Sequence, residues 1–168
     1  MGNNNKKRYL LLHLIVFDLD FTLWDAAGTW CDHTCPPFQK KGDVVVDCRG
    51  GIISLYPDVK KILILLKEQG YRLAIASRTG EPEWASQLMD IFDIKKYFDY
   101  LEIYPASKLV HFDKMKRKLG IGYDRMIFFD DEIRNIDEVG ALGVATCHVT
   151  GGITFRLVER KLMDCLRV

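Results

Sequence analysis

Apolar and polar residues follow one another along this chain in the way that strands and helices alternate in an α/β protein. The apolar run from Leu11 to Phe17 has the length of a strand, and its lack of polar alternation is typical of a central parallel strand covered on both faces. Further on, strand-length apolar runs take turns with segments that carry apolar residues at helical spacing. The predicted strands cover residues 71–76, 100–104, 125–129 and 144–149, and the predicted helices cover 57–70, 81–92, 107–119, 133–142 and a last segment from about residue 154. This order predicts an α/β fold with a doubly wound parallel sheet and helices on both faces.

Residues 25–54 interrupt the alternation. They have no helical period, and they contain Pro36-Pro37 and a glycine pair, Gly50-Gly51, between two short β-branched runs, which predicts a hairpin or flap. About thirty residues are too few to build a separate cap domain over a substrate. We therefore expect one domain over residues 9–168 with a flap at 25–54, no large cap domain, and a polar, disordered segment at residues 1–8.

The composition of the chain bears on whether it binds nucleic acid or a membrane. The 168 residues are 48% hydrophobic, which suffices for a sizeable core, and 24 Lys plus Arg against 23 Asp plus Glu give a net charge of +1. Because this balance gives no electrostatic reason to bind nucleic acid or a membrane, we expect neither partner, and we expect a monomer. The five cysteines are odd in number, which favours a reducing compartment: the cytoplasm, with the nucleus as a second possibility.

Polar residues follow the predicted strands at the edge of the sheet where ligands bind in this fold class. Asp18 and Asp20 follow the first strand, Ser77 the second, Lys108 comes shortly after the third, and Asp130-Asp131 end the fourth. Two carboxylates as close as Asp18 and Asp20 repel each other, and a hard divalent cation such as Mg²⁺ would relieve the repulsion. Each position alone also fits a strand followed by a polar turn. Together they predict a site.

A carboxylate nucleophile, a metal and a lysine in one crevice suit phosphoryl transfer. Asp18 would attack phosphorus and form an aspartyl-phosphate. Asp20 would protonate the leaving oxygen and later deprotonate a water molecule. Lys108 would offset the negative charge, and Ser77 would bind a phosphate oxygen together with nearby backbone N–H groups.

Neighbouring residues would support this chemistry. Thr22 would orient Asp20 or its loop through its hydroxyl group. Trp24 either packs in the core or lines the pocket as part of the substrate site. Asp130 and Asp131 would complete the metal site, one directly and the other through water.

Four motifs resemble those of the haloacid dehalogenase (HAD) superfamily of aspartate-nucleophile phosphatases, in order and in approximate spacing. They are Asp18-Leu19-Asp20-Phe21-Thr22, Ser77-Arg78-Thr79, Lys108, and Asp130-Asp131 with Asn135. Longer segments resemble the eukaryotic magnesium-dependent phosphatase family over about residues 12–155. These segments are residues 20–24, 55–57, 76–79, 102–108 and 126–132.

The resemblance implies a Mg²⁺ cofactor bound by the Asp18 carboxylate, the backbone carbonyl of Asp20 and one acid of the fourth motif. Asp131 is the expected direct ligand, because Asp131 and Asn135 carry the four-residue spacing of the pair in that motif. Leu19 and Arg78, inside the first two motifs, become candidates for substrate binding. The family implies activity toward phosphotyrosine proteins or small phosphomonoesters such as sugar phosphates and glycated-amine phosphates.

Alternatives remain open at this point. The chain could be a catalytically weak phosphate- or protein-binding module that kept the fold. A dinucleotide-binding oxidoreductase would share the alternation, but the Gly-x-Gly-x-x-Gly pattern is missing after the first strand. In the flap, Cys31, His33, Cys35 and Cys48 could bind zinc, or the cysteines could be free thiols in a mobile loop.

Overall fold

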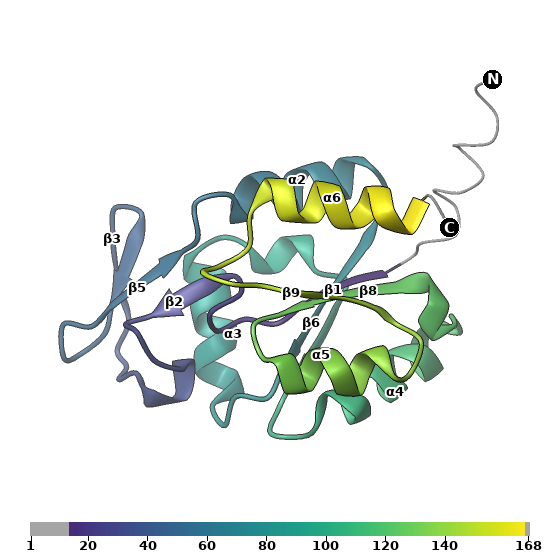
Figure 1. Ribbon diagram of the computed structural model, residues 1–168. Helices are drawn as coiled ribbons and strands as arrows, with labels where there is room; N and C mark the ends of the chain where they lie inside the picture. Colours follow the sequence, from purple (N-terminus) through teal and green to yellow (C-terminus); the bar gives the residue numbers. More distant parts are fainter. Residues whose placement is uncertain (1–13, 167–168) are drawn as a thin grey trace.

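A five-stranded parallel sheet in the order β7-β6-β1-β8-β9 forms the centre of the computed structural model, which describes residues 14–166 (Figure 1). Its strands are β1 (Leu14–Phe17), β6 (Arg72–Ser77), β7 (Tyr100–Ile103), β8 (Met126–Asp130) and β9 (Ala145–His148). β1 lies in the middle, where Val16 is in register with Ala74 of β6 and Phe128 of β8. The predicted parallel sheet is confirmed. The predicted disordered segment 1–8 and the start of the predicted strand at Leu11 lie outside the described residues.

Helices cover both faces of this sheet, as predicted. They are α2 (Val59–Glu68), α3 (Pro82–Ile91), α4 (Lys108–Leu119), α5 (Ile133–Gly140) and α6 (Phe155–Leu166), with short 3₁₀ helices η2 (Lys95–Tyr97) and η3 (Tyr123–Arg125). Figure 1 shows α2 and α6 on one side of the sheet and α4 and α5 on the other. No helix among residues 14–166 combines the length and the apolar character that crossing a membrane requires.

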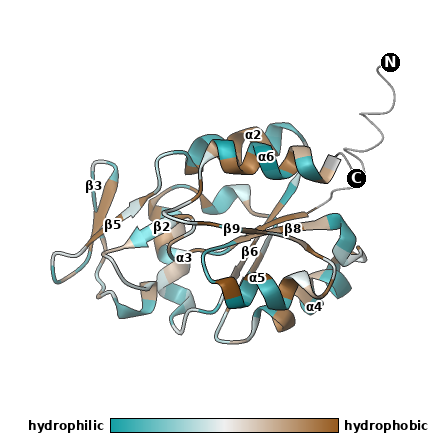
Figure 2. Cartoon of the chain, viewed as in Figure 1, coloured by the Kyte–Doolittle hydropathy of each residue, from teal (hydrophilic) through white to brown (hydrophobic). Residues whose placement is uncertain are grey.

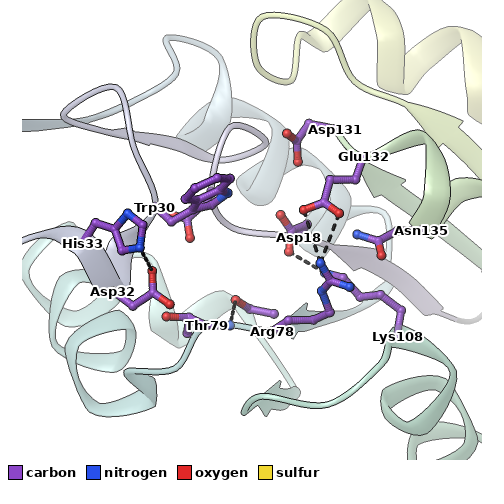
Figure 3. Close-up of a pocket in the computed structure, with 12 residues that line it drawn as sticks. Asp18, Trp30, Asp32, His33, Arg78, Thr79, Lys108, Asp131, Glu132 and Asn135 are labelled. Carbon is purple, nitrogen blue, oxygen red and sulfur yellow. Dashed lines mark hydrogen bonds and ion pairs between the residues drawn. The ribbon is translucent and has the colours of Figure 1, made fainter.

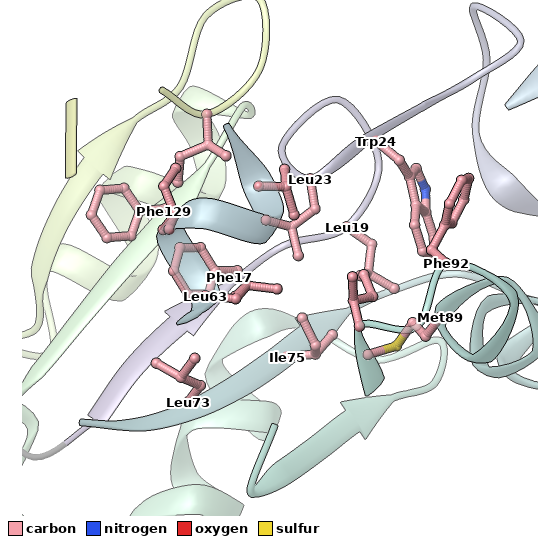
Figure 4. Packing of buried hydrophobic residues seen from close by; sticks show 14 of the residues in the cluster. Phe17, Leu19, Leu23, Trp24, Leu63, Leu73, Ile75, Met89, Phe92 and Phe129 are labelled. Carbon is pink, nitrogen blue, oxygen red and sulfur yellow. The ribbon is translucent and has the colours of Figure 1, made fainter. Parts of the chain in front are cut away.

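The core divides into two apolar clusters because successive strand residues point to opposite faces. Ile15 and Phe17 of β1 join the cluster under α2, α3 and α6, whereas Leu14 and Val16 join the one under α4 and α5. In the first cluster the ring of Phe17 stacks on Phe129 with 5.3 Å between centroids (Figure 4). Each fully buried side chain of this size stabilises the fold by about 1.5–3 kcal/mol. Figure 2 shows the apolar residues gathered on the strands and the inward helix faces.

The predicted flap is a second, four-stranded antiparallel sheet in the order β2-β5-β4-β3, which projects from one end of the molecule in Figure 1. Its elements are β2 (Trp24–Ala26), the 3₁₀ helix η1 (Cys31–His33), β3 (Gln39–Lys41), β4 (Val44–Val46) and β5 (Ile52–Leu55). The predicted hairpin is the β4–β5 pair, with Val45 opposite Ile53. Within residues 14–166 the flap is the insertion between β1 and α2, and no large cap domain accompanies it.

Two of the three flap cysteines are neither of the alternatives that the sequence left open, free thiols or zinc ligands. Cys35 and Cys48 form a disulfide bond with 5.3 Å between their Cα atoms, and the Cys48 N–H donates to the Cys35 carbonyl at 2.7 Å. The buried carboxylate of Asp47 holds the same turn by accepting from the N–H groups of Cys35, Arg49 and Gly51. Sulfur atoms bonded to each other cannot serve as thiolate ligands, so Cys35 and Cys48 do not form the zinc site that was one alternative, whereas Cys31 is a free, buried thiol. The compartment of the protein stays a prediction.

The segment between β9 and α6 packs against the residues just before and just after the flap. The Ile153 N–H donates to the Thr22 carbonyl at 3.0 Å, and the Phe155 N–H donates to the Asp58 carboxylate at 2.9 Å. The loop lies so close to Tyr56 that a Cβ added at Gly152 would be 2.2 Å from the Tyr56 ring. Gly152 also has φ +86°, a conformation that glycine adopts without steric cost.

We expect Gly152→Ala to lower the free energy of unfolding by about 2–5 kcal/mol, from left-handed backbone strain together with the contact on Tyr56. Gly151→Ala is the matched control, because Gly151 has φ +69° and nothing within 4 Å of an added Cβ. It should cost only the backbone strain, about 1–2 kcal/mol. Urea unfolding of both variants measures the difference, and equal losses would contradict the close approach.

Candidate active site

A pocket of about 210 Å³ opens at the carboxyl ends of β1, β6 and β8, where the predicted residues were expected to meet. The flap forms its far wall (Figure 3). Of the predicted residues, six line the pocket together with Asn135: Asp18, Asp20, Ser77, Arg78, Lys108 and Asp131.

Lys108 lies at the floor of this pocket between two buried carboxylates. Its Nζ is 2.5 Å from Asp18 Oδ1 and 3.1 Å from Asp130 Oδ2, and it also donates to the Ala76 carbonyl. The side chain is only 1% exposed. Burial alone would lower the pKa of Lys108, but Asp18 and Asp130 outweigh it and raise the pKa above its ordinary value. The ammonium group therefore stays protonated.

Asp130 is held by groups at the start of α5. It is completely buried, its Oδ1 accepts from the Glu132 N–H at 2.7 Å, and both of its oxygens are 3.1 Å from Asn135 Nδ2. The sequence argument used the spacing of Asp131 and Asn135 to choose Asp131 as the direct metal ligand, and that assignment stays a prediction. The first turn of α5 brings the Asn135 amide back onto the last residue of β8. Within residues 14–166, Asn135 Oδ1 is buried and has no hydrogen-bond partner.

Three carboxylates form a cluster suited to a cation. Asp18, Asp130 and Asp131 each bring one oxygen within 4.8 Å of the others. Oxygen donors of this kind are what Mg²⁺ prefers, and the unsatisfied Asn135 Oδ1 beside them is a further oxygen that could accept from a water ligand. The residues therefore fit Mg²⁺. Asp131 faces the pocket and is half-buried, whereas Asp130 is engaged by Lys108 and Asn135.

The carboxylate of Asp20 is held by the flap and lies outside this cluster. Its Oδ1 accepts from the Trp24 indole N–H at 2.7 Å and from the Cys31 backbone N–H at 3.0 Å. Burial raises the pKa of Asp20 to about 6, and these two hydrogen bonds oppose the rise. The expected metal contact through the Asp20 backbone carbonyl stays a prediction.

Three predicted substrate-binding residues are absent from the pocket wall. The side chains of Leu19, Thr22 and Trp24 are fully buried. Leu19 packs in the core, and its carbonyl accepts from the N–H groups of the following turn. Thr22 Oγ1 has no hydrogen-bond partner within the described part of the chain, so the predicted contact from its hydroxyl to Asp20 is not formed. Trp24 positions Asp20 through its indole N–H, because the turn after β1 directs the ring inward.

The loop after β6 forms part of the rim of the pocket. Ser77 lies at the end of β6 with its Oγ 3.4 Å from the Thr79 N–H. Arg78 forms an ion pair with Glu132 at the rim of the pocket, with its Nη2 3.1 Å from Oε2. This ion pair joins the loops that follow β6 and β8. Thr79 and Glu132 also line the pocket, although the sequence argument had not selected them.

The flap contributes three pocket residues that the sequence argument did not select as substrate contacts: Trp30, Asp32 and His33. Asp32 Oδ2 accepts from the Gly80 N–H at 3.2 Å, which joins η1 to the loop after β6. The sequence signal that could have identified them is Trp30, a bulky aromatic residue close to charged residues in a loop with few apolar side chains. The sequence argument considered His33 only as a zinc ligand.

Comparisons with known proteins agree with this geometry. The family model described as Acid Phosphatase matches residues 10–166. Human magnesium-dependent phosphatase 1 is 46% identical over 151 residues, which are 89% of this chain and 84% of the human protein. A HAD-like hydrolase superfamily protein of Schizosaccharomyces pombe is 39% identical over 77% of this chain and 81% of its own length. A putative phosphatase from Clostridium difficile has a similar fold, with a TM-score of 0.65 at 17% identity over 89% of this chain and 91% of that one.

The two acids at the end of β8 should differ in what their loss changes. Asp130→Asn should lower the free energy of unfolding by about 3 kcal/mol in a chelator, because it breaks the buried pair with Lys108. Asp131→Asn should change that stability little and should raise the Mg²⁺ concentration needed for half-maximal thermal stabilisation by more than about tenfold. Urea unfolding and a Mg²⁺ titration of melting temperature test both, and the reverse ranking would refute this division.

Proposed function

This chain belongs to the acid phosphatase family and is a magnesium-dependent phosphatase of the HAD superfamily, and we propose that it hydrolyses phosphomonoesters through an aspartyl-phosphate on Asp18. The observation that carries the proposal is the buried Lys108 ammonium between Asp18 and Asp130 at the floor of an open pocket. Burial raises the pKa of Asp18 well above its ordinary value, and Lys108 opposes that rise, so the ammonium group favours the ionised, nucleophilic form of Asp18. It also provides positive charge where a phosphate would bind.

Asp18 and Asp131 would hold Mg²⁺ directly, and Asp130 would support the site without being a direct ligand. When bound, Mg²⁺ acts as a Lewis acid that neutralises charge on the phosphoryl oxygens. Asp18 and Asp131 line the pocket, whereas the carboxylate of Asp130 contacts Lys108, Asn135 and the Glu132 N–H.

The chain's own groups supply the proton transfers. An oxygen of Asp18 attacks phosphorus and forms a new P–O bond, while the ester P–O bond breaks and the leaving oxygen takes a proton from Asp20. Asp20 then removes a proton from a water molecule, which attacks the aspartyl-phosphate and releases inorganic phosphate. Two hydrogen bonds to its Oδ1 hold Asp20 in place for both steps. Ser77 and Arg78 bind the non-bridging phosphate oxygens.

We include phosphotyrosine, sugar phosphates and glycated-amine phosphates among the substrates. The flap supports this breadth, because it forms a wall tied to Asp20 and Gly80 and leaves the mouth of the pocket open. Few groups then contact the leaving group, so most of the binding comes from the phosphate. We also expect the protein to act as a monomer in the cytoplasm.

The nucleophile is tested by Asp18→Asn. Phosphate release from any ester should fall by at least about 10³-fold, because the carboxamide is not nucleophilic. The free energy of unfolding should also fall, by about 3 kcal/mol, because the substitution breaks the buried pair with Lys108, so turnover is compared under conditions in which circular dichroism shows the variant folded. Asp20→Asn should slow turnover strongly while inorganic phosphate still binds. Asp43→Asn, at an exposed acid of the flap, is the control. Normal turnover by the Asp18 variant would disprove the aspartyl-phosphate.

Substrate size is tested with a panel of phenyl phosphate, glucose 6-phosphate and a phosphotyrosine peptide, with and without Mg²⁺. We expect all three to be hydrolysed with kcat/KM values within about 10³-fold of one another, because the binding energy comes mainly from the shared phosphate. A chelator should abolish all three activities. If one small ester were hydrolysed and the peptide were inert, the open pocket would not explain the specificity.

A further inference from the structure

Trp30 is a half-exposed aromatic side chain on the wall of the pocket, and the steps described above do not use it. Its exposed fraction is 50%, although tryptophan is among the most costly side chains to leave in water. Figure 3 shows the indole on the flap side, across the pocket from Lys108 and Asn135. A leaving group attached to a phosphate bound at Asp18 and Ser77 would extend toward this wall.

The segment that follows Trp30 in the chain is fixed. The backbone N–H of Cys31, the next residue, donates to Asp20 Oδ1 at 3.0 Å. Asp32, two residues after Trp30, accepts from the Gly80 N–H at 3.2 Å. Trp30 is thereby held beside the residue that would protonate the leaving oxygen. Binding at this wall would cost little entropy for ordering the loop.

The indole itself is also oriented by its neighbours. The rings of Phe21 and His33 stand perpendicular to it, with centroid distances of 6.4 Å and 5.3 Å. Phe21 reaches this position with φ +58°, a strained conformation for a residue other than glycine. Strain of this kind is typical of functional sites.

Trp30 is the aromatic surface on this wall. Its neighbour Asp32 accepts from the Gly80 N–H through Oδ2, and Asp32 Oδ1 is 4.0 Å from His33 Nε2, which is too far for a hydrogen bond. The indole therefore offers a flat apolar surface to an aromatic leaving group.

We propose that Trp30 forms a leaving-group subsite that selects aromatic phosphomonoesters, by stacking its indole on the phenolic ring. The inference rests on the proposed phosphatase function and names its preferred substrate class. The ring is the same in a free aryl phosphate and in phosphotyrosine within a peptide, so both sources fit. Stacking of two aromatic rings makes Trp30 a determinant of specificity, whereas the bond-breaking steps stay with Asp18 and Asp20.

The test compares aryl with non-aryl ligands in Trp30→Ala and Trp30→Phe. The ratio of kcat/KM for phenyl phosphate to that for glucose 6-phosphate should fall about tenfold in Trp30→Ala. Most of it should be kept in Trp30→Phe, which retains a flat ring. Ile52→Ala is the matched control, because Ile52 is a 57% exposed apolar residue of the same flap outside the pocket. Free phosphotyrosine and a phosphotyrosine peptide, run side by side, distinguish the two sources of the ring.

A binding measurement separates this inference from the proposed function. The affinity of benzylphosphonate, which is not hydrolysed, should weaken about tenfold in Trp30→Ala, and that of methylphosphonate should not change. Equal losses for both ligands or for both substrates, or no loss for either, would overturn the subsite. If the wild type released no phosphate from any ester with Mg²⁺ present, the proposed function would fail, and the phosphonate comparison would still test Trp30.

Discussion

The buried ammonium group of Lys108 must pair with the carboxylates of Asp18 and Asp130, and the arrangement of strands and helices around the site satisfies this requirement. Lys108, Asp18 and Asp130 are nearly inaccessible to water, and charges taken out of water are tolerated only when they pair closely. The pairing requires that β1 and β8 end at the same level and that α4 begins beside them. Parallel strands adjacent in the sheet meet the first condition, and the crossover after β7 meets the second. The strand order of the sheet therefore brings together the charged groups that must pair.

The same cluster explains why a cation belongs there. Asp131 adds a third carboxylate to the group, and Lys108 carries a single positive charge facing two of them. Burial and repulsion from Asp130 raise the pKa values of Asp18 and Asp131, and a divalent ion would favour their ionised forms. Asn135 reduces the cost for Asp130 by donating to both of its oxygens, so the open side of the cluster is the side that faces the pocket.

Asp20 links this centre to the flap. Its carboxylate accepts from the Trp24 indole and from the Cys31 backbone, so the residue proposed to transfer protons also anchors η1. The disulfide between Cys35 and Cys48 and the buried Asp47 stabilise the flap further along the chain. The wall that carries Trp30 is therefore part of the rigid framework, which agrees with a pocket that stays open to bulky leaving groups.

The order of strands and helices, the flap hairpin and the meeting of Asp18, Ser77, Lys108 and Asp131 in one pocket were all predictable from the sequence. The period of apolar residues determines each element locally, and parallel strands bring their carboxyl ends to one edge. Only the tertiary structure decided that Asn135 contacts Asp130, that Cys35 joins Cys48, and that Trp30 reaches the pocket while Trp24 is buried. These outcomes depend on how segments rotate and approach one another, as when Asp32 meets Gly80 across 48 residues of chain. Side-chain direction in an irregular loop follows from such contacts, because no repeating local pattern encodes it.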